Sequence, residues 1–331
     1  MKPDGTLLLT RGDVAGLLDL DQCIEAVEQA FKMHLEGKTL PPGVLGVPSR
    51  AGGFHIKAAG LKLARTYFAV KTNGNFFENK AKFGMPNIQG IIMLCDGENG
   101  YPLALMDSIE ITIVRTGAAT AVAAKYLARP DSRVATIIGC GNQGRIQLKA
   151  LMKVLDLERV YAYDSEQEAA RRFAEELSSD AGVEVKAVGD LSEAVPQSDV
   201  CVTCTPSKRA FLGRRHVAPG AFIAAVGADN EDKRELDADL MASGKIVVDI
   251  MEQCATIGEL HHALEEGVIS RSDVHSELAG VIAGRKAGRT DREEIVIFDS
   301  TGTALQDVAA AAAVYEKALK QGAGISVNFA G

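Results

Sequence analysis

Near the middle of the chain stands Val134-Ala135-Thr136-Ile137-Ile138-Gly139-Cys140-Gly141-Asn142-Gln143-Gly144-Arg145. Its apolar start predicts a buried strand, which breaks into the pattern GxGxxG and continues into helix-forming sequence. Gly139 permits a tight turn, Gly141 lets a pyrophosphate approach the backbone, and Gly144 lets the new helix pack on the strand. The helix start at Asn142 and Gln143 presents N–H groups to phosphate. The run therefore predicts a dinucleotide site.

A carboxylate follows the next predicted strand. This strand covers residues 159–163 and ends in Asp164, about twenty residues after Gly144, where an acid would hold the hydroxyls of the adenosine ribose. Glu166 adds a second carboxylate and the nearest cations are Arg171 and Arg172, so the segment favours NAD over NADP. In the alternative interpretation Asp164 caps the helix that begins near Glu166.

Length and charge indicate a cytoplasmic protein that acts on small molecules. The chain has 331 residues, enough for two domains with cores of their own. A net charge of -8 and the lack of a dense Lys/Arg run argue against nucleic acid or a membrane surface as partner. The sequence shows no N-terminal targeting segment and no apolar run of about 20 residues, so secretion and membrane spanning are not expected.

The metal-binding residue types are not arranged as a metal site. Cys201 and Cys204 have CxxC spacing, but they lie in an apolar predicted strand and no second ligand pair with zinc spacing exists, which favours buried thiols. His261 and His262 are adjacent and are expected to diverge on a helix. We therefore expect no metal.

Two patterns of secondary structure divide the chain. A helix is predicted over residues 17–35, followed by strands at 54–57, 67–71, 90–95 and 102–106 that indicate a mostly antiparallel sheet. A small-residue helix then runs to Ala128 from a predicted capping box at residues 107–110. Beyond it strands and helices alternate. The expected fold is α/β, a doubly wound parallel Rossmann sheet plus a smaller α+β domain.

The parallel strands are predicted at 134–138, 159–163, 183–187, 199–204, 221–226, 246–249 and 295–298. Such a sheet binds its ligands beyond the carboxyl ends of its strands. Besides the glycine loop and Asp164, the residues there are Thr205-Pro206-Ser207, Gly227-Ala228-Asp229 and Asp299-Ser300-Thr301-Gly302. An alanine-rich helix at 304–321 is expected to pack back onto the first domain.

Three polar residues outside the glycine loop are candidates for chemistry. Lys71 ends a predicted strand and could project into a cleft, or it could be a solvated edge lysine. Arg115, in the small-residue helix, could bind a carboxylate or form a structural salt bridge. Asp229 could serve as general acid or base, or cap a helix. His55 and Lys57 would share one face of a strand and are further pocket candidates.

Several motifs together resemble the ornithine cyclodeaminase/mu-crystallin family, and the resemblance covers nearly the whole chain. Besides the glycine loop, they are Phe68-Ala69-Val70-Lys71-Thr72-Asn73-Gly74-Asn75, Gly84-Met85-Pro86-Asn87-Ile88-Gln89-Gly90, Arg115-Thr116-Gly117-Ala118-Ala119, Gly227-Ala228-Asp229 with Lys233-Arg234-Glu235-Leu236, and Phe298-Asp299-Ser300-Thr301-Gly302 with Asp307-Val308.

The resemblance implies a homodimer with a substrate-binding and dimerisation domain of residues 1–126 plus 306–331, and a Rossmann domain of residues 127–305. It implies hydride transfer at the α-carbon of a small amino or imino acid, with Lys71 as the active-site lysine and Arg115 as the carboxylate-binding arginine. It further implies Asp229 as acid/base near the substrate nitrogen. Thr205, Pro206, Gly227, Ser300 and Gly302 are expected to contact the cofactor.

Two departures from the family pattern concern the substrate. Many members have an arginine shortly after paired prolines, whereas Pro41-Pro42 is followed by Gly43-Val44-Leu45-Gly46. Ornithine cyclodeaminases have a glutamate near the position of Lys57, and a cation there would repel the δ-ammonium of ornithine. In the alternative interpretation Lys57 is a surface residue. The leading interpretation is thus an NAD-dependent imino-acid reductase or amino-acid dehydrogenase. A cyclodeaminase with internally recycled NAD and a non-catalytic, dinucleotide-dependent binding protein are the alternatives.

Overall fold

The computed structural model describes residues 5–329, which form two compact units. One unit holds the residues up to Arg115 and those from Thr303 onward, and the other runs from Thr116 to Gly302. The division expected from the sequence counted residues 109–126 of helix α4 (Ile109–Leu127) with the first unit and residues 303–305 with the second, whereas here the boundaries fall after Arg115 and before Thr303.

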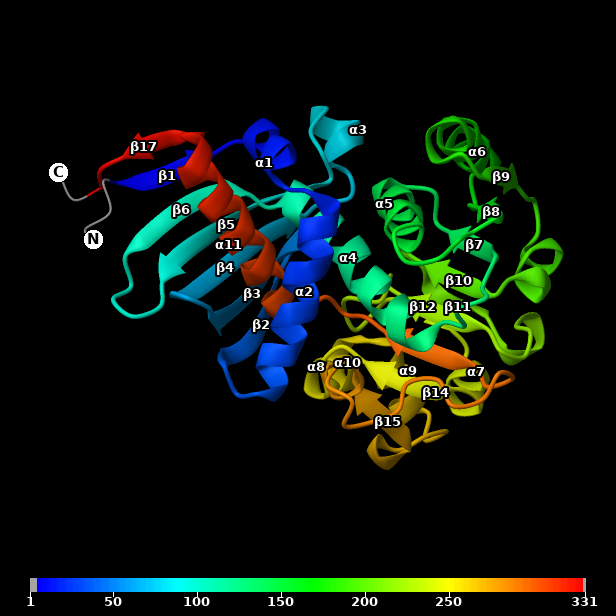
Figure 1. Ribbon diagram of the computed structural model, residues 1–331. Coiled ribbons are helices and arrows are strands. Elements are labelled where there is room, and N and C mark those ends of the chain that lie inside the picture. Colours follow the sequence, from blue (N-terminus) through cyan, green and yellow to red (C-terminus); the bar gives the residue numbers. More distant parts are fainter. Residues whose placement is uncertain (1–4, 330–331) are drawn as a thin grey trace. The chain divides into compact units, whose positions relative to one another are not determined.

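The first unit is a seven-stranded sheet with order β17-β1-β6-β5-β4-β3-β2. Helix α11 lies against its strands β3 and β4, with α2 beside α11 and against β3 (Figure 1). Its strands are β1 (Thr6–Leu9), β2 (Thr39–Ser49), β3 (Gly52–Lys62), β4 (Thr66–Asn75), β5 (Ile88–Asp96), β6 (Pro102–Asp107) and β17 (Ile325–Val327). Its helices are α1 (Arg11–Leu17), α2 (Leu20–Leu35), α3 (Asn79–Phe83) and α11 (Ala304–Gln321).

Strand β4 places Lys71 on the helix-covered face of this sheet. Tyr67, Ala69 and Lys71 are buried and alternate with partly exposed residues, as the two-residue period of a strand requires. The strand was predicted to end at Lys71, but it continues to Asn75 because its ladder with β3 continues through residues 72–75. Lys71 is 3% exposed, so the solvated-lysine interpretation is wrong.

One predicted helix start differs from the structure, and a second agrees with it in part. The helix expected over 17–35 is interrupted after Leu17, because Asp19 caps a new helix by accepting a hydrogen bond from the N–H of Gln22 at 3.1 Å. At the start of α4, Asp107 accepts hydrogen bonds from the N–H of Ile109 at 2.9 Å and from the N–H of Glu110 at 3.3 Å, which is the Asp107 half of the predicted capping box. The Ser108 hydroxyl donates to Asn73.

The second unit is built on an eight-stranded parallel sheet with order β15-β14-β16-β12-β10-β7-β8-β9 (Figure 1). Its strands are β7 (Val134–Ile138), β8 (Arg159–Tyr163), β9 (Glu184–Ala187), β10 (Val200–Thr203), β12 (Phe222–Ala225), β14 (Lys245–Val248), β15 (Val274–Glu277) and β16 (Val296–Asp299). Strands β11 (Lys208–Leu212) and β13 (Arg234–Leu236) pair separately. Its helices beyond α4 are α5 (Asn142–Leu151), α6 (Gln167–Ala181), α7 (Ala238–Ser243), α8 (Met251–Ile257), α9 (Glu259–Glu265) and α10 (Leu278–Ile282).

The strand order creates one topological switch point. From β7 the chain adds β8 and β9 on one side, then returns to place β10 on the other side of β7. Connections leave the two neighbouring strands β7 and β10 in opposite directions there, which opens a crevice outside their carboxyl ends. The glycine loop after β7 and Thr205 after β10 therefore lie at the expected ligand site of this unit.

Candidate functional site

A cavity of about 810 Å³ lies at this switch point. Its lining includes Gly139, Gly141, Asp164, Thr205 and Pro206, together with Arg172 and Phe211. A volume of this size is typical of cofactor sites. The lining omits six of the predicted cofactor contacts, which are Asn142, Gln143, Gly144, Gly227, Ser300 and Gly302.

The three glycines of the loop have three different environments. Gly139 has a φ of +105°, which L side chains rarely adopt. A Cβ on Gly144 would lie 2.2 Å from the Gly139 carbonyl oxygen, so only glycine lets α5 pack this close to β7. A Cβ on Gly141 would meet no atom within 4 Å. The side of Gly141 is thus open, as the approach of a pyrophosphate requires.

Asp164 connects the glycine loop to the next strand. Its carboxylate accepts hydrogen bonds from the N–H of Cys140 at 2.8 Å and from the N–H of Glu166 at 2.9 Å. It is not the cap of α6, since Glu166 occupies the N-cap position without a side-chain hydrogen bond. Asp164 therefore lines the cavity and also holds the loop that would surround a pyrophosphate.

Asp229 follows β12 in a turn that leads to β13. Its carboxylate forms an ion pair of 2.7 Å with Lys233, and its side chain is 38% exposed. The N-cap position of the next helix, α7, is occupied by Asp237, so the helix-cap interpretation of Asp229 is wrong. A partly exposed carboxylate beside one lysine can exchange protons with a ligand.

Two other predicted cofactor contacts lie at the end of β16. Gly302 has a φ of +74° and donates its N–H to Asp249 at 2.8 Å. The hydroxyl of Ser300 is buried and has no hydrogen-bond partner among residues 5–329. A buried hydroxyl without a partner is one that a ligand can satisfy.

In the first unit, Lys71 and Arg115 meet at one buried carboxylate, that of Asp307. The ammonium of Lys71 lies 2.8 Å and 2.9 Å from the two carboxylate oxygens, and the Nε atom of Arg115 lies 3.0 Å from one of them. Arg115 also donates to the side-chain oxygen of Gln306 at 2.7 Å. We call these four residues the cation cluster. Arg115 was interpreted either as a carboxylate-binding residue or as part of a structural salt bridge, and the structure shows the salt bridge.

Burial and charge set the protonation of the cation cluster. Burial lowers the pKa of Lys71 to about 7; Asp307 opposes this shift, and Arg115 and Lys57 add to it. Burial raises the pKa of Asp307, but Lys71 and Arg115 outweigh burial and hold that pKa below its ordinary value. Asp307 is therefore ionised, while Lys71 changes its charge near neutral pH.

Lys57 and His55 lie on the same sheet face as Lys71. Lys57 pairs in register with Lys71, and His55 pairs with Asn73 on the neighbouring strand. Lys57 is 5% exposed, so it is not a surface residue. Its charge contributes to the lowered pKa values of both Lys71 and Asp307. Lys57 is therefore close enough to influence the cation cluster.

Asp307 and Gln306 were not among the predicted site residues. Both lie in the first turn of α11, and Asp307 meets Lys71 across 236 positions of sequence. The amide nitrogen of Gln306 is buried and has no hydrogen-bond partner among the described residues. The only sequence signal was the presence of Asp307 in one of the family motifs, which named no role for it.

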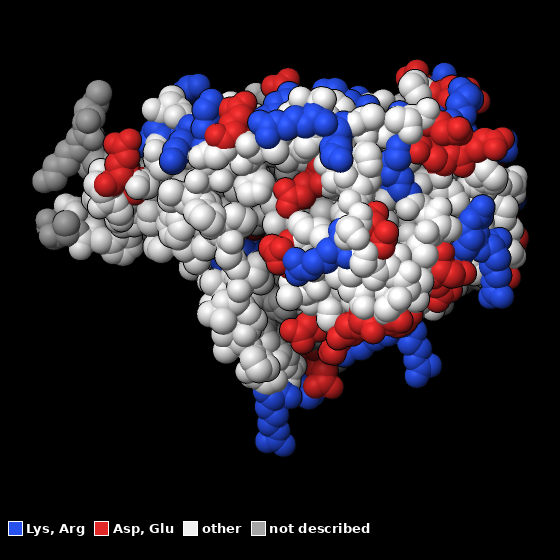
Figure 2. All heavy atoms as spheres, turned by 90° about the horizontal axis from the view of Figure 1, so that it is seen from below, with Lys and Arg blue, Asp and Glu red and all other residues white. Residues whose placement is uncertain are grey.

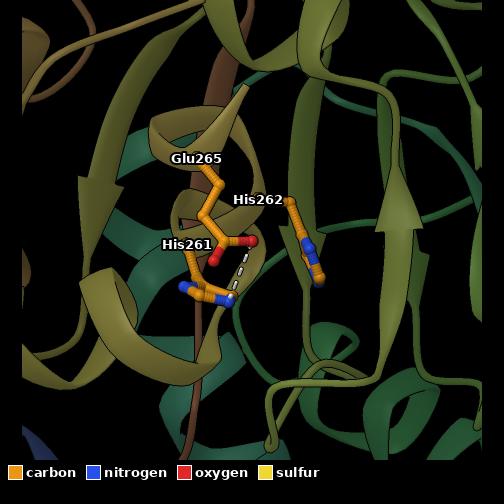
Figure 3. Close-up of side chains that lie close together, drawn as sticks. All are labelled: His261, His262 and Glu265. Atoms are coloured by element: carbon orange, nitrogen blue, oxygen red, sulfur yellow. Dashed lines mark ion pairs between the residues drawn. The ribbon is translucent and has the colours of Figure 1, made fainter. Parts of the chain in front are cut away.

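His261 and His262 were expected to diverge on a helix, but their side chains lie close together. Ligand atoms of His261, His262 and Glu265 all lie within 4.8 Å of one another (Figure 3). However, His261 pairs with Glu265 at 3.4 Å, and the Nε2 atom of His262 is 2.8 Å from the carbonyl oxygen of Lys233.

Cys201 and Cys204 are free thiols, and burial raises the pKa of both.

Together these features define a dinucleotide-binding α/β protein with a separate buried cation cluster. A model of the ornithine cyclodeaminase/mu-crystallin family matches residues 5–322, and the chain belongs to this family.

Three solved structures are similar to the chain over nearly all of its length. An archaeal alanine dehydrogenase dimer with bound NAD is 41% identical, with a TM-score of 0.93 over 98% of this chain and 99% of that one. The Thermococcus litoralis delta(1)-pyrroline-2-carboxylate reductase with NADH and L-proline is 38% identical, with a TM-score of 0.92 over 97% and 100%. The Paracoccus denitrificans iminosuccinate reductase with NAD+ is 32% identical, with a TM-score of 0.90 over 98% and 100%.

Proposed function

We propose that the chain is an NAD-dependent oxidoreductase that transfers hydride at the α-carbon of a small amino or imino acid. The observation that carries this proposal is the cation cluster. Lys71 and Arg115 share the single carboxylate of Asp307, so the cluster retains positive charge that a substrate carboxylate can neutralise. The unpartnered amide nitrogen of Gln306 supplies a further donor beside Arg115.

The cavity of the second unit fits the cofactor. The open side of Gly141 can accommodate a pyrophosphate, and the carboxylate of Asp164 lines the same cavity for the ribose hydroxyls. Glu166 also lines this cavity and disfavours the 2′-phosphate of NADP. Solved relatives with 32–41% identity contain NAD or NADH. When bound, NAD accepts or supplies the hydride.

The candidate site residues then have defined roles in the proposed reaction. Arg115 and Lys71 hold the carboxylate of the substrate and so fix which face of the α-carbon is presented. Asp229 exchanges a proton with the substrate nitrogen, and its ion pair with Lys233 holds the carboxylate in place. Lys57 adds positive charge near the carboxylate site and favours a substrate without a cationic side chain.

We further propose that two copies of the chain associate through the uncovered face of the first unit's sheet. Val70, Met93 and Leu105 are neighbours in register on that face, and all three are partly exposed. Figure 2, which shows the molecule from below, has a broad area in its left-hand part without charged side chains. One archaeal relative was solved as a dimer.

Within residues 5–329, every helix is too short or too polar to span a lipid bilayer.

The decisive test is a substrate panel with NADH. Pyruvate with ammonia, delta(1)-pyrroline-2-carboxylate and oxaloacetate with ammonia should be offered, and loss of the reduced-nicotinamide absorbance followed. We expect oxidation of NADH with at least one of them. No oxidation, together with ammonia release from ornithine or lysine at catalytic NAD, would indicate a cyclodeaminase instead. No turnover of any kind would favour a binding protein.

The role of Asp229 is tested on the substrate found. Asp229→Asn should abolish turnover and leave NADH binding intact, because the amide cannot exchange the proton. Asp232→Asn is the matched control, since Asp232 is an exposed carboxylate of the same turn that pairs with Lys208. Equal activity of both variants would remove Asp229 from the mechanism.

A further inference from the structure

Glu235, on strand β13, joins two loops at the carboxyl edge of the parallel sheet. One carboxylate oxygen accepts hydrogen bonds from the N–H and the hydroxyl of Thr205, both at 2.7 Å. The other accepts from the N–H of Gly227 at 2.9 Å. Thr205 follows β10 and Gly227 follows β12, which are neighbouring strands. A single side chain, 0% exposed, thus fixes the separation of these two loops.

The hydrogen bonds of Glu235 also orient a wall of the cofactor cavity. Because the Thr205 hydroxyl donates to Glu235, it accepts from the N–H of Ser207, at 3.2 Å. This arrangement turns the Thr205 methyl group toward the glycine loop, where it would lie 3.1 Å from a Cβ on Gly139. Thr205 and Ser207 both line the cavity, whereas Glu235 does not.

Glu235 is itself held rigidly. Glu259 accepts hydrogen bonds from the N–H of Glu235 at 2.8 Å and from the N–H of Leu236 at 3.0 Å, which fixes the backbone of β13. There is no room for the loop to move inward, because a Cβ on Gly227 would lie 2.4 Å from the Glu235 carboxylate. Buried groups outside the cavity lining thus hold the two loops in position.

The loops that Glu235 joins belong to one half of the dinucleotide site. In a doubly wound sheet, the strands on one side of the switch point serve the adenosine half and those on the other side serve the second nucleotide. Asp164, after β8, lies on the adenosine side, and Thr205 and Gly227 lie on the other. Asp229 follows Gly227 by two positions in the same turn.

We propose that Glu235 is a positioning residue for the nicotinamide half of the cofactor: it holds Thr205 in the cavity wall and the turn that carries Asp229. The inference rests on the proposed cofactor but not on the proposed substrate. It therefore predicts a specific pattern of nucleotide affinities, which can be measured without any substrate.

The test compares two nucleotides in the Glu235→Gln variant. The glutamine side chain has an NH2 group in place of one carboxylate oxygen. This group would face an N–H that now donates to Glu235, so one buried hydrogen bond is lost. We expect NADH to bind roughly tenfold more weakly or worse. The affinity for 5′-AMP, which occupies the adenosine half only, should be unchanged. NADH binding is followed by the fluorescence of NADH and AMP binding by calorimetry.

Asp199→Asn is the matched control. Asp199 is a carboxylate that accepts hydrogen bonds from the N–H groups of Arg133 and Val134 at 2.7 Å and 2.9 Å, at the amino edge of the same sheet. Its loss should lower thermal stability without separating the two affinities. If Glu235→Gln binds NADH like the unmodified protein, or loses NADH and AMP affinity equally, the proposal is wrong.

A second variant keeps the test decisive if Glu235→Gln does not fold. Glu235→Asp keeps the charge but shortens the side chain, so that it cannot reach Thr205 and Gly227 together. We expect the same pattern, weaker NADH binding with unchanged AMP binding. An equal loss of affinity for both nucleotides in Glu235→Asp would contradict the positioning role. Failure of the substrate panel would leave these measurements valid, so the two proposals fail independently.

Discussion

At the scale of single residues, the pKa of Lys71 predicts how substrate binding depends on pH. The ammonium has a pKa of about 7, so it is protonated below that pH and loses its charge as the pH rises through it. We expect kcat/KM for the acid substrate to fall above about pH 7, because the neutral amine attracts the carboxylate less. Lys71→Arg should remove this fall, since a guanidinium stays charged. An unchanged alkaline limb in that variant would assign the limb to another group.

Asp307 is the residue that keeps the cation cluster together. Asp307→Asn leaves Lys71 and Arg115 buried without their shared carboxylate. Breaking a buried ion pair in this way costs about 3–5 kcal/mol. Thermal unfolding by circular dichroism should show that loss, and Lys71→Met in addition should recover part of it, because one of the unpaired charges is removed. A double variant no more stable than Asp307→Asn would show that the two groups are not coupled.

At the scale of elements, two glycines of the loop have different roles. Gly144 allows helix packing, and Gly141 allows a ligand to approach. Gly144→Ala would place a Cβ 2.2 Å from the Gly139 carbonyl oxygen and push α5 away from β7. Such overpacking costs about 1–3 kcal/mol of stability. Gly141→Ala meets open space instead, so it should fold normally and bind NADH poorly. Unfolding curves and NADH titrations of both variants check this contrast, and equal stability of the two would contradict it.

The elements also show what the sequence could and could not predict. The strands next to the glycine loop and the helix at 304–321 were predicted because each has a strong local period and clear ends. Strand β2 was not predicted, because it contains Pro41, Pro42 and Gly43, residue types that are rare inside strands. The structure accommodates them on an edge strand, with a shift of register between Leu40 and Gly43.

The candidate site was predictable only where the chemistry is local. Gly139 and Asp164 follow predicted strands, and the structure places both in the lining of one cavity. The meeting of Lys71 with Asp307, and of Glu235 with Thr205 and Gly227, depends on how the chain folds back on itself. No periodicity encodes such pairs, so Asp307, Gln306 and Glu235 had no predicted role.

At the scale of the whole molecule, the uncovered sheet face of the first unit predicts self-association. Val70, Met93 and Leu105 form a row across three strands, and burying such a row against a second copy would remove apolar surface from water. Met93→Glu would bury a charge in that interface, which is costly without a partner. We expect the unmodified chain to have the mass of a dimer by light scattering, and Met93→Glu to have the mass of a monomer.

Leu319→Glu provides the control for this prediction. Leu319 is an exposed leucine, 51% accessible, on α11, which packs against the other face of the same sheet. The substitution adds the same charge away from the proposed interface and should leave the dimer intact. If both variants stay dimeric, the copies associate through a different surface. If the unmodified chain is itself monomeric at micromolar concentration, its sheet face has some other role, and the activity assay decides whether one copy is sufficient for turnover.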